Sequence, residues 1–137
     1  MDEYITEYRV SWDHTDCTTR IYFTVYMKWL DDAITEYFRS KGFTFDAVGK
    51  LFLNGERVVN SFAIGEYTCR INRPSKFDDM IRVRVKVKEM REKVLVFEGI
   101  FEDTESDAAL GRGETTFICV DDEGRSANIP ENVRARL

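Results

Sequence analysis

Residues Val10–Phe38 read VSWDHTDCTTRIYFTVYMKWLDDAITEYF, and the second half of this stretch predicts the central element of the fold. From about Thr24 to Ser40, apolar side chains recur in pairs every four residues, as in a helix with one face on a core. Thr24 is the expected N-cap, and Gly42 is the expected C-terminal stop. The stretch therefore predicts one helix of about five turns.

Strand-like segments lie on both sides of this helix, one before it and four after it. They are expected at residues 4–12, 58–73, 80–90, 93–103 and 110–121. The segment 80–90 is the clearest, because apolar residues alternate with Arg and Lys as in a half-buried antiparallel strand. Gly65 is expected to bend the strand at 58–73. One helix packed on one five-stranded antiparallel sheet is an α+β architecture.

The remaining segments are predicted to be connections. A turn or loop is expected at 13–22, a short loop or helical turn near 45–48, a turn at 74–76, a polar loop at 104–109 and a short tail from Pro130.

The composition predicts one globular domain, residues 1–137. Hydrophobic residues make up 43% of the chain, which is too many for a disordered protein. The net charge of -5 disfavours nucleic acid and anionic membranes as partners. Three cysteines without CxxC spacing, an acidic N-terminus and the lack of a long apolar run together predict a reduced cytoplasmic protein.

His14 is the only histidine, which narrows the possible chemistry. Multi-histidine metal sites are excluded, and a triad would have to be built on His14 alone. A thiolate at Cys17 would also depend on His14, so Cys17 is expected to be a small buried residue. Catalysis would therefore use carboxylates, hydroxyls, thiols or backbone dipoles. No metal and no cofactor is expected.

Polar side chains are densest between the first strand and the helix, in residues 12–23, with Asp16 at the centre. The loop ends at a helix N-terminus, where unpaired N–H groups favour negative charge. A carboxylate can attack a carbonyl carbon or activate water, and the helix amides can stabilise the resulting oxyanion. Asp16 is thus a candidate catalytic carboxylate, with turn capping as the structural alternative.

At these residues the sequence resembles the 4-hydroxybenzoyl-CoA thioesterase family of hotdog-fold acyl-CoA thioesterases. The second Asp of the family's Gly-Asp-x-Asp loop falls on Asp16, and its aromatic pair falls on Tyr22-Phe23. Residues 67–79, YTCRINRPSKFDD, resemble the strand that leads into the family's aromatic-x-Asp turn. Residues 117–137 resemble its closing strand and tail.

The resemblance implies a hotdog fold, in which a five-stranded antiparallel sheet wraps one long helix. It implies hydrolysis of an acyl-CoA thioester, with Asp16 as nucleophile or general base and the backbone N–H of Phe23 as the oxyanion donor. CoA is then part of the substrate. The family forms homodimers or dimers of dimers, so the partner's Asn60, Ser61 and Phe62 are expected to line the pocket. Pairing of edge strands would also protect them from aggregation.

Further candidate residues surround this centre. His14 is either a catalytic base beside Asp16 or a structural loop residue. Thr19, Tyr22 and Tyr26 are candidate substrate contacts, with core packing as the alternative for the two tyrosines.

Arg91 and Lys93 follow the basic face of the 80–90 strand. The resemblance places the phosphates of CoA near their turn, and phosphates favour Arg and Lys donors. A solvated outer face is the alternative reading of these cations.

Four positions depart from the family pattern: Asp13, His14, Thr19 and Val25. Thr19 replaces a glycine, and a residue other than glycine is strained where the backbone is left-handed. The departures keep two alternatives open. One is a non-catalytic protein that binds acyl-CoA or a fatty acyl group, and the other is a hotdog hydratase or dehydratase that uses His14 with Asp16.

Overall fold

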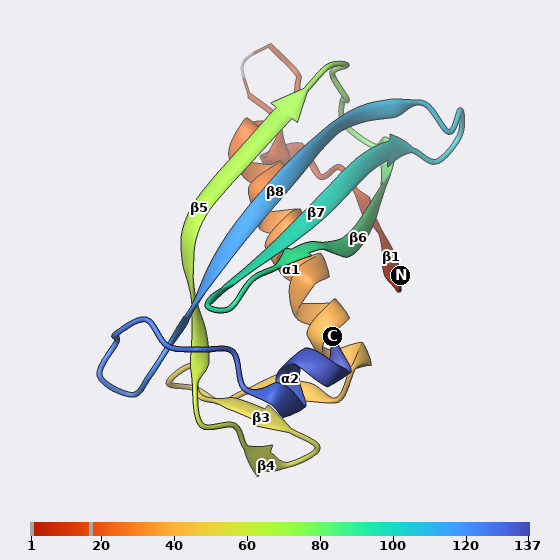
Figure 1. Ribbon diagram of the computed structural model, residues 1–137. Coiled ribbons are helices and arrows are strands. Elements are labelled where there is room, and N and C mark those ends of the chain that lie inside the picture. Colours follow the sequence, from red (N-terminus) through yellow and green to blue (C-terminus); the bar gives the residue numbers. More distant parts are fainter. Residues whose placement is uncertain (1, 17) are drawn as a thin grey trace.

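The long helix α1, Phe23–Ser40, lies against one face of a large antiparallel sheet (Figure 1). The computed structural model describes residues 2–16 and 18–137, so the prediction for Cys17 lies outside the described residues. Seven side chains of α1 are buried, and they follow the predicted spacing: Tyr26, Trp29, Leu30, Ala33, Ile34, Tyr37 and Phe38. In the described residues, no helix is both long and apolar enough to cross a membrane.

The large sheet has five strands in the order β1-β6-β7-β8-β5. Their bounds are Glu3–Arg9 for β1, Ser61–Ile71 for β5, Met80–Met90 for β6, Val94–Asp103 for β7 and Ala109–Val120 for β8. All neighbouring strands are antiparallel. The predicted helix on a five-stranded antiparallel sheet is therefore confirmed, and β1 and β5 are its two edges.

The predicted bend at Gly65 is also confirmed, because the register of β5 against β8 shifts between Ile64 and Glu66. Other glycines let the helix approach the sheet. A Cβ atom on Gly99 would clash with the Leu30 side chain, and one on Gly113 would lie 3.0 Å from Leu30 Cδ2. The absence of these two side chains allows α1 to sit directly on β7 and β8.

The two ends of α1 differ in how well the sequence predicts them. Thr24 is not the N-cap, because the helix begins at Phe23 with Tyr22 in the cap position. The Tyr22 N–H bonds to the His14 carbonyl and the Tyr22 carbonyl accepts the Val25 N–H, so loop bonds fix the start. The predicted stop is confirmed, since Gly42 follows the helix with a φ of 90°.

The loop expected near residues 45–48 is confirmed as residues 46–50, but a second, small sheet that the sequence did not predict lies on both sides of it. The small sheet consists of β2, Phe43–Phe45, β3, Leu51–Leu53, and β4, Glu56–Arg57. Asn54 and Gly55 have positive φ and form the tight turn between β3 and β4. Strands this short contain too few residues for alternation to be visible in the sequence.

The C-terminal tail is also partly helical. Helix α2 spans Glu131–Arg136 and buries Val133, with Pro130 at its N-cap. Leu137, at its C-cap, contacts the central helix, because the Tyr37 hydroxyl donates to the Leu137 carbonyl at 3.3 Å. The prediction of a plain tail was therefore wrong.

Candidate active site

The loop before α1 is a closed turn that presents Asp16. The Asp16 N–H donates to the Arg20 carbonyl at 2.8 Å, and the Thr19 N–H donates to the Asp16 carbonyl at 3.0 Å. Thr15 and Ile21 pair in an antiparallel bridge at the base of the turn. These bonds fix the backbone on both sides of the candidate carboxylate.

The same loop is attached to the connection between β5 and β6. Arg20 forms an antiparallel bridge with Lys76, and the Ile21 N–H donates to the Ser75 carbonyl at 3.3 Å. Ser75 is almost completely buried. The β5–β6 connection therefore holds the Asp16 loop in place through backbone contacts.

Two donors of Thr18 converge on one oxygen of Asp16. The Thr18 N–H lies 2.7 Å from Asp16 Oδ1, and the Thr18 hydroxyl donates to the same atom. The hydroxyl first, and then the N–H, lower the pKa of the Asp16 carboxyl below its ordinary value because they stabilise the charged form. Asp16 is thus ionised at neutral pH, and both Thr18 donors bind the same one of its two carboxylate oxygens.

Thr19 completes this turn in an unusual conformation. Its φ is 67°, in the left-handed region that costs an L-residue about 1–2 kcal/mol. This is the position at which the resemblance places a glycine. The left-handed turn is thus formed here with a β-branched residue, and backbone strain is stored beside the candidate carboxylate.

His14 is held by its neighbours on both sides of the ring. Its Nδ1 accepts the Ser11 N–H at 2.9 Å, which leaves the ring proton of the neutral imidazole on Nε2. The ring packs edge-on against Trp29, with centroids 5.5 Å apart, and the carbonyl accepts the Tyr22 N–H. These contacts favour the structural reading of His14, whereas its predicted catalytic role stays a prediction.

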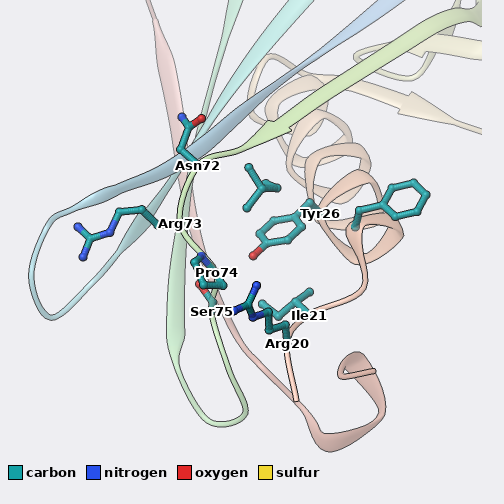
Figure 2. A pocket seen from close by; sticks show the side chains of 9 residues that line it. Arg20, Ile21, Tyr26, Asn72, Arg73, Pro74 and Ser75 are labelled. Carbon is teal, nitrogen blue, oxygen red and sulfur yellow. The ribbon is translucent and has the colours of Figure 1, made fainter. Parts of the chain in front are cut away.

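The first turn of α1 borders a cavity of about 260 Å³ (Figure 2). Its walls include residues from the loop, from the helix and from the β5–β6 connection: Arg20, Ile21, Phe23, Tyr26, Arg73 and Ser75. Asp16 lies in the same loop but outside these walls. Phe23 is 67% exposed, and its N–H has no hydrogen-bond partner among the described residues. An amide at this position can bind a developing oxyanion.

The two candidate tyrosines differ in their surroundings. Tyr22 is exposed, whereas Tyr26 is buried between Trp29 and Phe101 at ring centroid distances of 5.6 and 5.1 Å. Burial raises the pKa of the Tyr26 phenol, and the Ser75 hydroxyl opposes this shift. Figure 2 shows the Tyr26 hydroxyl directed toward the side of the cavity formed by Pro74 and Ser75. The ring of Tyr26 thus packs in the core, and its hydroxyl oxygen lies at the cavity wall.

The other predicted substrate contacts lie around the start of β5, at the end of this strand away from the Asp16 loop (Figure 1). The Asn60 side-chain amide donates a hydrogen bond to the Asn128 carbonyl, and the Ser61 hydroxyl donates one to the Gly49 carbonyl. Phe62 packs against Phe38, with ring centroids 6.0 Å apart. One chain therefore does not bring these three residues to Asp16.

Arg91 and Lys93 lie in the β6–β7 turn, which is also far from the Asp16 loop within the chain (Figure 1). Arg91 forms a two-point ion pair with Glu89, at 2.8 and 3.1 Å. The charge of the Arg91 guanidinium is thus partly neutralised by Glu89, near the end of β6. The role predicted for both cations stays a prediction.

Three cations near the cavity were not predicted as site residues: Arg20, Arg73 and Lys76. The turn at 74–76 is visible in the sequence, but its pairing with the Asp16 loop is a long-range contact without a sequence signal.

The fold and this loop define a hotdog protein of the thioesterase class. The sequence model of the Thioesterase-like superfamily matches residues 10–137, and the chain belongs to this superfamily. The chain is similar to the acyl-CoA thioester hydrolase YbgC of Escherichia coli O6:H1, with 29% identity over 113 residues, 82% of this chain and 78% of that protein. The predicted family and enzyme class are therefore confirmed.

Solved structures support the same fold. The 1,4-dihydroxy-2-naphthoyl-CoA thioesterase from Synechocystis superposes with a TM-score of 0.83 at 16% identity, covering 98% of this chain and 95% of that one. A gentisyl-coenzyme A thioesterase superposes with a TM-score of 0.80 at 23% identity, covering 96% and 98%. The predicted hotdog fold is confirmed by these neighbours.

Proposed function

We propose that this protein hydrolyses acyl-CoA thioesters and that Asp16 is its catalytic carboxylate. The superfamily and the YbgC relative support the reaction. The observation that carries the residue assignment is the closed turn that holds an ionised Asp16 next to the start of α1. We further propose that the protein needs no cofactor and acts in the cytoplasm.

The loop geometry supports two forms of the first step. Asp16 either attacks the thioester carbonyl carbon itself or removes a proton from a water that attacks it. In both forms the carbonyl oxygen becomes an oxyanion, which the Phe23 N–H and the helix dipole stabilise. When water attacks, the C–S bond breaks to give the free acid, and the proton that Asp16 removed goes to the thiolate of CoA. When Asp16 attacks, C–S cleavage leaves a mixed anhydride between Asp16 and the acyl group, and one water then hydrolyses this anhydride to the free acid and the Asp16 carboxylate while a proton from that water goes to the CoA thiolate.

Asp16→Asn tests this assignment, because it removes the charge and keeps the shape. We expect thiol release from acyl-CoA to fall by roughly 10²- to 10⁴-fold. Asp13→Asn is the matched control, since Asp13 is exposed in the same segment. Unchanged thermal unfolding would show that both variants fold. A fully active Asp16→Asn enzyme would end the proposal, and binding of acyl-CoA without turnover by the wild type would favour the acyl-CoA-binding alternative.

We also propose that the active unit is a homodimer paired through the edge strand β5, Ser61–Ile71. Residues 63–66 of this strand are exposed, and Ile64 is 57% exposed. An unpaired edge of this length invites another strand. The strand has 11 residues. Antiparallel pairing about Glu66 would therefore set the partner subunit's Ser61 opposite Ile71.

This pairing would complete the site. Ile71 lines the cavity next to Phe23, so the partner subunit's Asn60, Ser61 and Phe62 would reach the place where the resemblance expects them. Two such dimers would form the tetramer that the resemblance allows.

A lysine placed on one edge strand at a time tests which edge of the sheet forms the proposed dimer. Ile64→Lys on β5 is expected to shift the protein toward monomers in light scattering and to reduce hydrolysis. Ile5→Lys on β1 is the matched control, because Ile5 is 50% exposed on the opposite edge. Dimers that survive Ile64→Lys but dissociate with Ile5→Lys would show that the wrong edge was chosen.

A further inference from the structure

Arg20 lies where two cavities beside the start of α1 adjoin. It lines the cavity of about 260 Å³ together with Phe23, whose N–H we assign to the oxyanion, and it also lines a second cavity of about 320 Å³. In a thioester the sulfur is bonded directly to the carbonyl carbon. A cation in the wall of the cavity that holds the carbonyl is therefore close to the place where the leaving thiolate forms.

The guanidinium of Arg20 is not engaged by the Asp16 carboxylate. Asp16 Oδ1 accepts its hydrogen bonds from Thr18, and the Arg20 charge is the smallest of the causes that lower the pKa of Asp16. The Arg20 side chain is exposed and forms no ion pair among the described residues. Its charge and its N–H donors are thus left for a group that enters the cavity.

Backbone contacts, and not its side chain, fix Arg20 in the loop. The Asp16 N–H donates to the Arg20 carbonyl at 2.8 Å, and Arg20 pairs with Lys76 in an antiparallel bridge. Figure 2 shows the Arg20 side chain extending from this loop toward Ser75 in the β5–β6 connection. Replacing the side chain should therefore leave the Asp16 turn closed.

The departure of CoA is the part of the proposed reaction to which no protein group is yet assigned. When the C–S bond breaks, its electron pair goes to sulfur, and an ordinary thiol has a pKa near 8.5. An adjacent arginine stabilises a thiolate and lowers the pKa of the thiol. Arginine keeps its protons at all relevant pH values, so it supplies charge while the proton for the thiolate still comes from water.

We propose that Arg20 is a further catalytic residue, whose guanidinium stabilises the CoA thiolate as the C–S bond breaks. The inference rests on the proposed function. It gives the leaving group a stabilising partner, as the Phe23 N–H is the partner of the oxyanion. The charges that develop on oxygen and on sulfur are then bound by two donors of the same cavity wall.

Thioesters of one acyl group with three thiols test the role of Arg20. CoA and pantetheine present the same alkyl thiol with and without the nucleotide, and thiophenol is a more acidic thiol whose thiolate needs less stabilisation. Arg20→Gln is expected to lower kcat/KM by roughly 10²-fold for acyl-CoA and acyl-pantetheine. The loss should be only a few-fold for the thiophenyl ester. Rates are measured above the acid limb, where Asp16 is ionised in both proteins.

The pattern of losses decides between the roles that Arg20 could have. An equal loss with all three esters would assign Arg20 to the Asp16 turn, and a loss with acyl-CoA alone would assign it to the phosphates. Either result would overturn the proposal, as would an Arg20→Gln enzyme with unchanged rates. Arg20→Lys keeps a positive charge and is expected to restore part of the rate with the two alkyl thioesters only.

Arg73→Gln is the matched control, because it removes a cation of the same cavity wall from another segment. It is expected to keep the wild-type ratio between alkyl and thiophenyl esters, and a change as large as that of Arg20→Gln would overturn the assignment to Arg20. Thermal unfolding shows whether each variant folds. A wild type that cleaves none of the three esters would refute the proposed function itself, whereas an equal loss in Arg20→Gln refutes this inference alone.

Discussion

Replacing Thr19 with glycine is expected to make the protein more stable. Thr19 has a φ of 67°, which costs about 1–2 kcal/mol for an L-residue. Glycine adopts this conformation freely but loses about 0.5–1 kcal/mol more conformational entropy on folding. The difference is a gain of about 0.5–1 kcal/mol in the free energy of unfolding, or about 2–4 °C in Tm for a domain of this size.

A series at the same position separates strain from the loss of the hydroxyl. Thr19→Asn should also stabilise, because Asn tolerates the left-handed region. Thr19→Ala keeps the strained Cβ and removes the hydroxyl that donates to the Thr18 carbonyl, so it should not stabilise. Urea unfolding monitored by circular dichroism gives the free energy of each variant.

Thr44→Gly provides the contrast. Thr44 is exposed in β2, where it does not have a positive φ, and glycine there should destabilise by about 0.5–1 kcal/mol. If Thr19→Gly destabilised the protein as much as Thr44→Gly, no strain would be stored at residue 19. The reasoning about the Asp16 turn would then be refuted.

Two further predictions concern the carboxylate and the core. Thr18→Val removes the hydroxyl that lowers the Asp16 pKa, so the acid limb of the pH profile of kcat/KM should move to higher pH; an unmoved limb would contradict this. The sign follows because only the ionised carboxylate is active and its pKa rises toward the ordinary value. Gly99→Ala forces a Cβ against Leu30 and should cost about 1–3 kcal/mol in urea unfolding, with a smaller cost in a Leu30→Val background. Equal costs in both backgrounds would contradict the proposed contact.

The helix and the large sheet are readable in the sequence because their patterns are long. The apolar pairs of α1 recur along a helix of 18 residues, and β6 alternates from Met80 to Lys88, so one register places most of the apolar side chains on the core. The short strands β2 to β4 have no such repetition. Their turns depend on positive φ at Gly49, Asn54 and Gly55. Of these residues, only the dipeptide Asn54-Gly55 indicates a tight turn in the sequence.

Helix α2 was predictable in principle. Pro130 followed by Glu131, with Arg134 and Arg136 in the last turn, has the polarity of a helix with its dipole compensated. The segment has only six residues, however, and an isolated helix of that length is unstable. It forms because Val133 is buried, and burial by distant elements is not visible in a local window.

In the candidate site, too, the features set by neighbours in the chain are predictable and those set by distant segments are not. The Asp16 loop and the helix N-terminus are neighbours in the chain, so the sequence brings them together. The cavity walls depend on the bridge between Arg20 and Lys76, which joins distant segments. The proposed role of Ser61 would depend on a second copy of the chain. Local order therefore predicts the reactive group, whereas the surfaces that would recognise substrate need tertiary and quaternary contacts.

The strain at Thr19 and the low pKa of Asp16 have one structural origin. The Thr18 donors reach the Asp16 carboxylate only while the turn is closed, and the bond from the Thr19 N–H to the Asp16 carbonyl closes it. Among the described residues, the other positions with positive φ that are not glycine are Asn54, Asp78 and Asp107, types that tolerate it. Thr19 alone in that set is β-branched, so the most strained of these four positions lies beside the ionised carboxylate. Strain of this kind persists where the surrounding structure over-determines it, and it clusters at functional sites. The bond from the Thr18 N–H to Asp16 Oδ1 is also that of an Asx-turn, so the same geometry serves the structural alternative of turn capping.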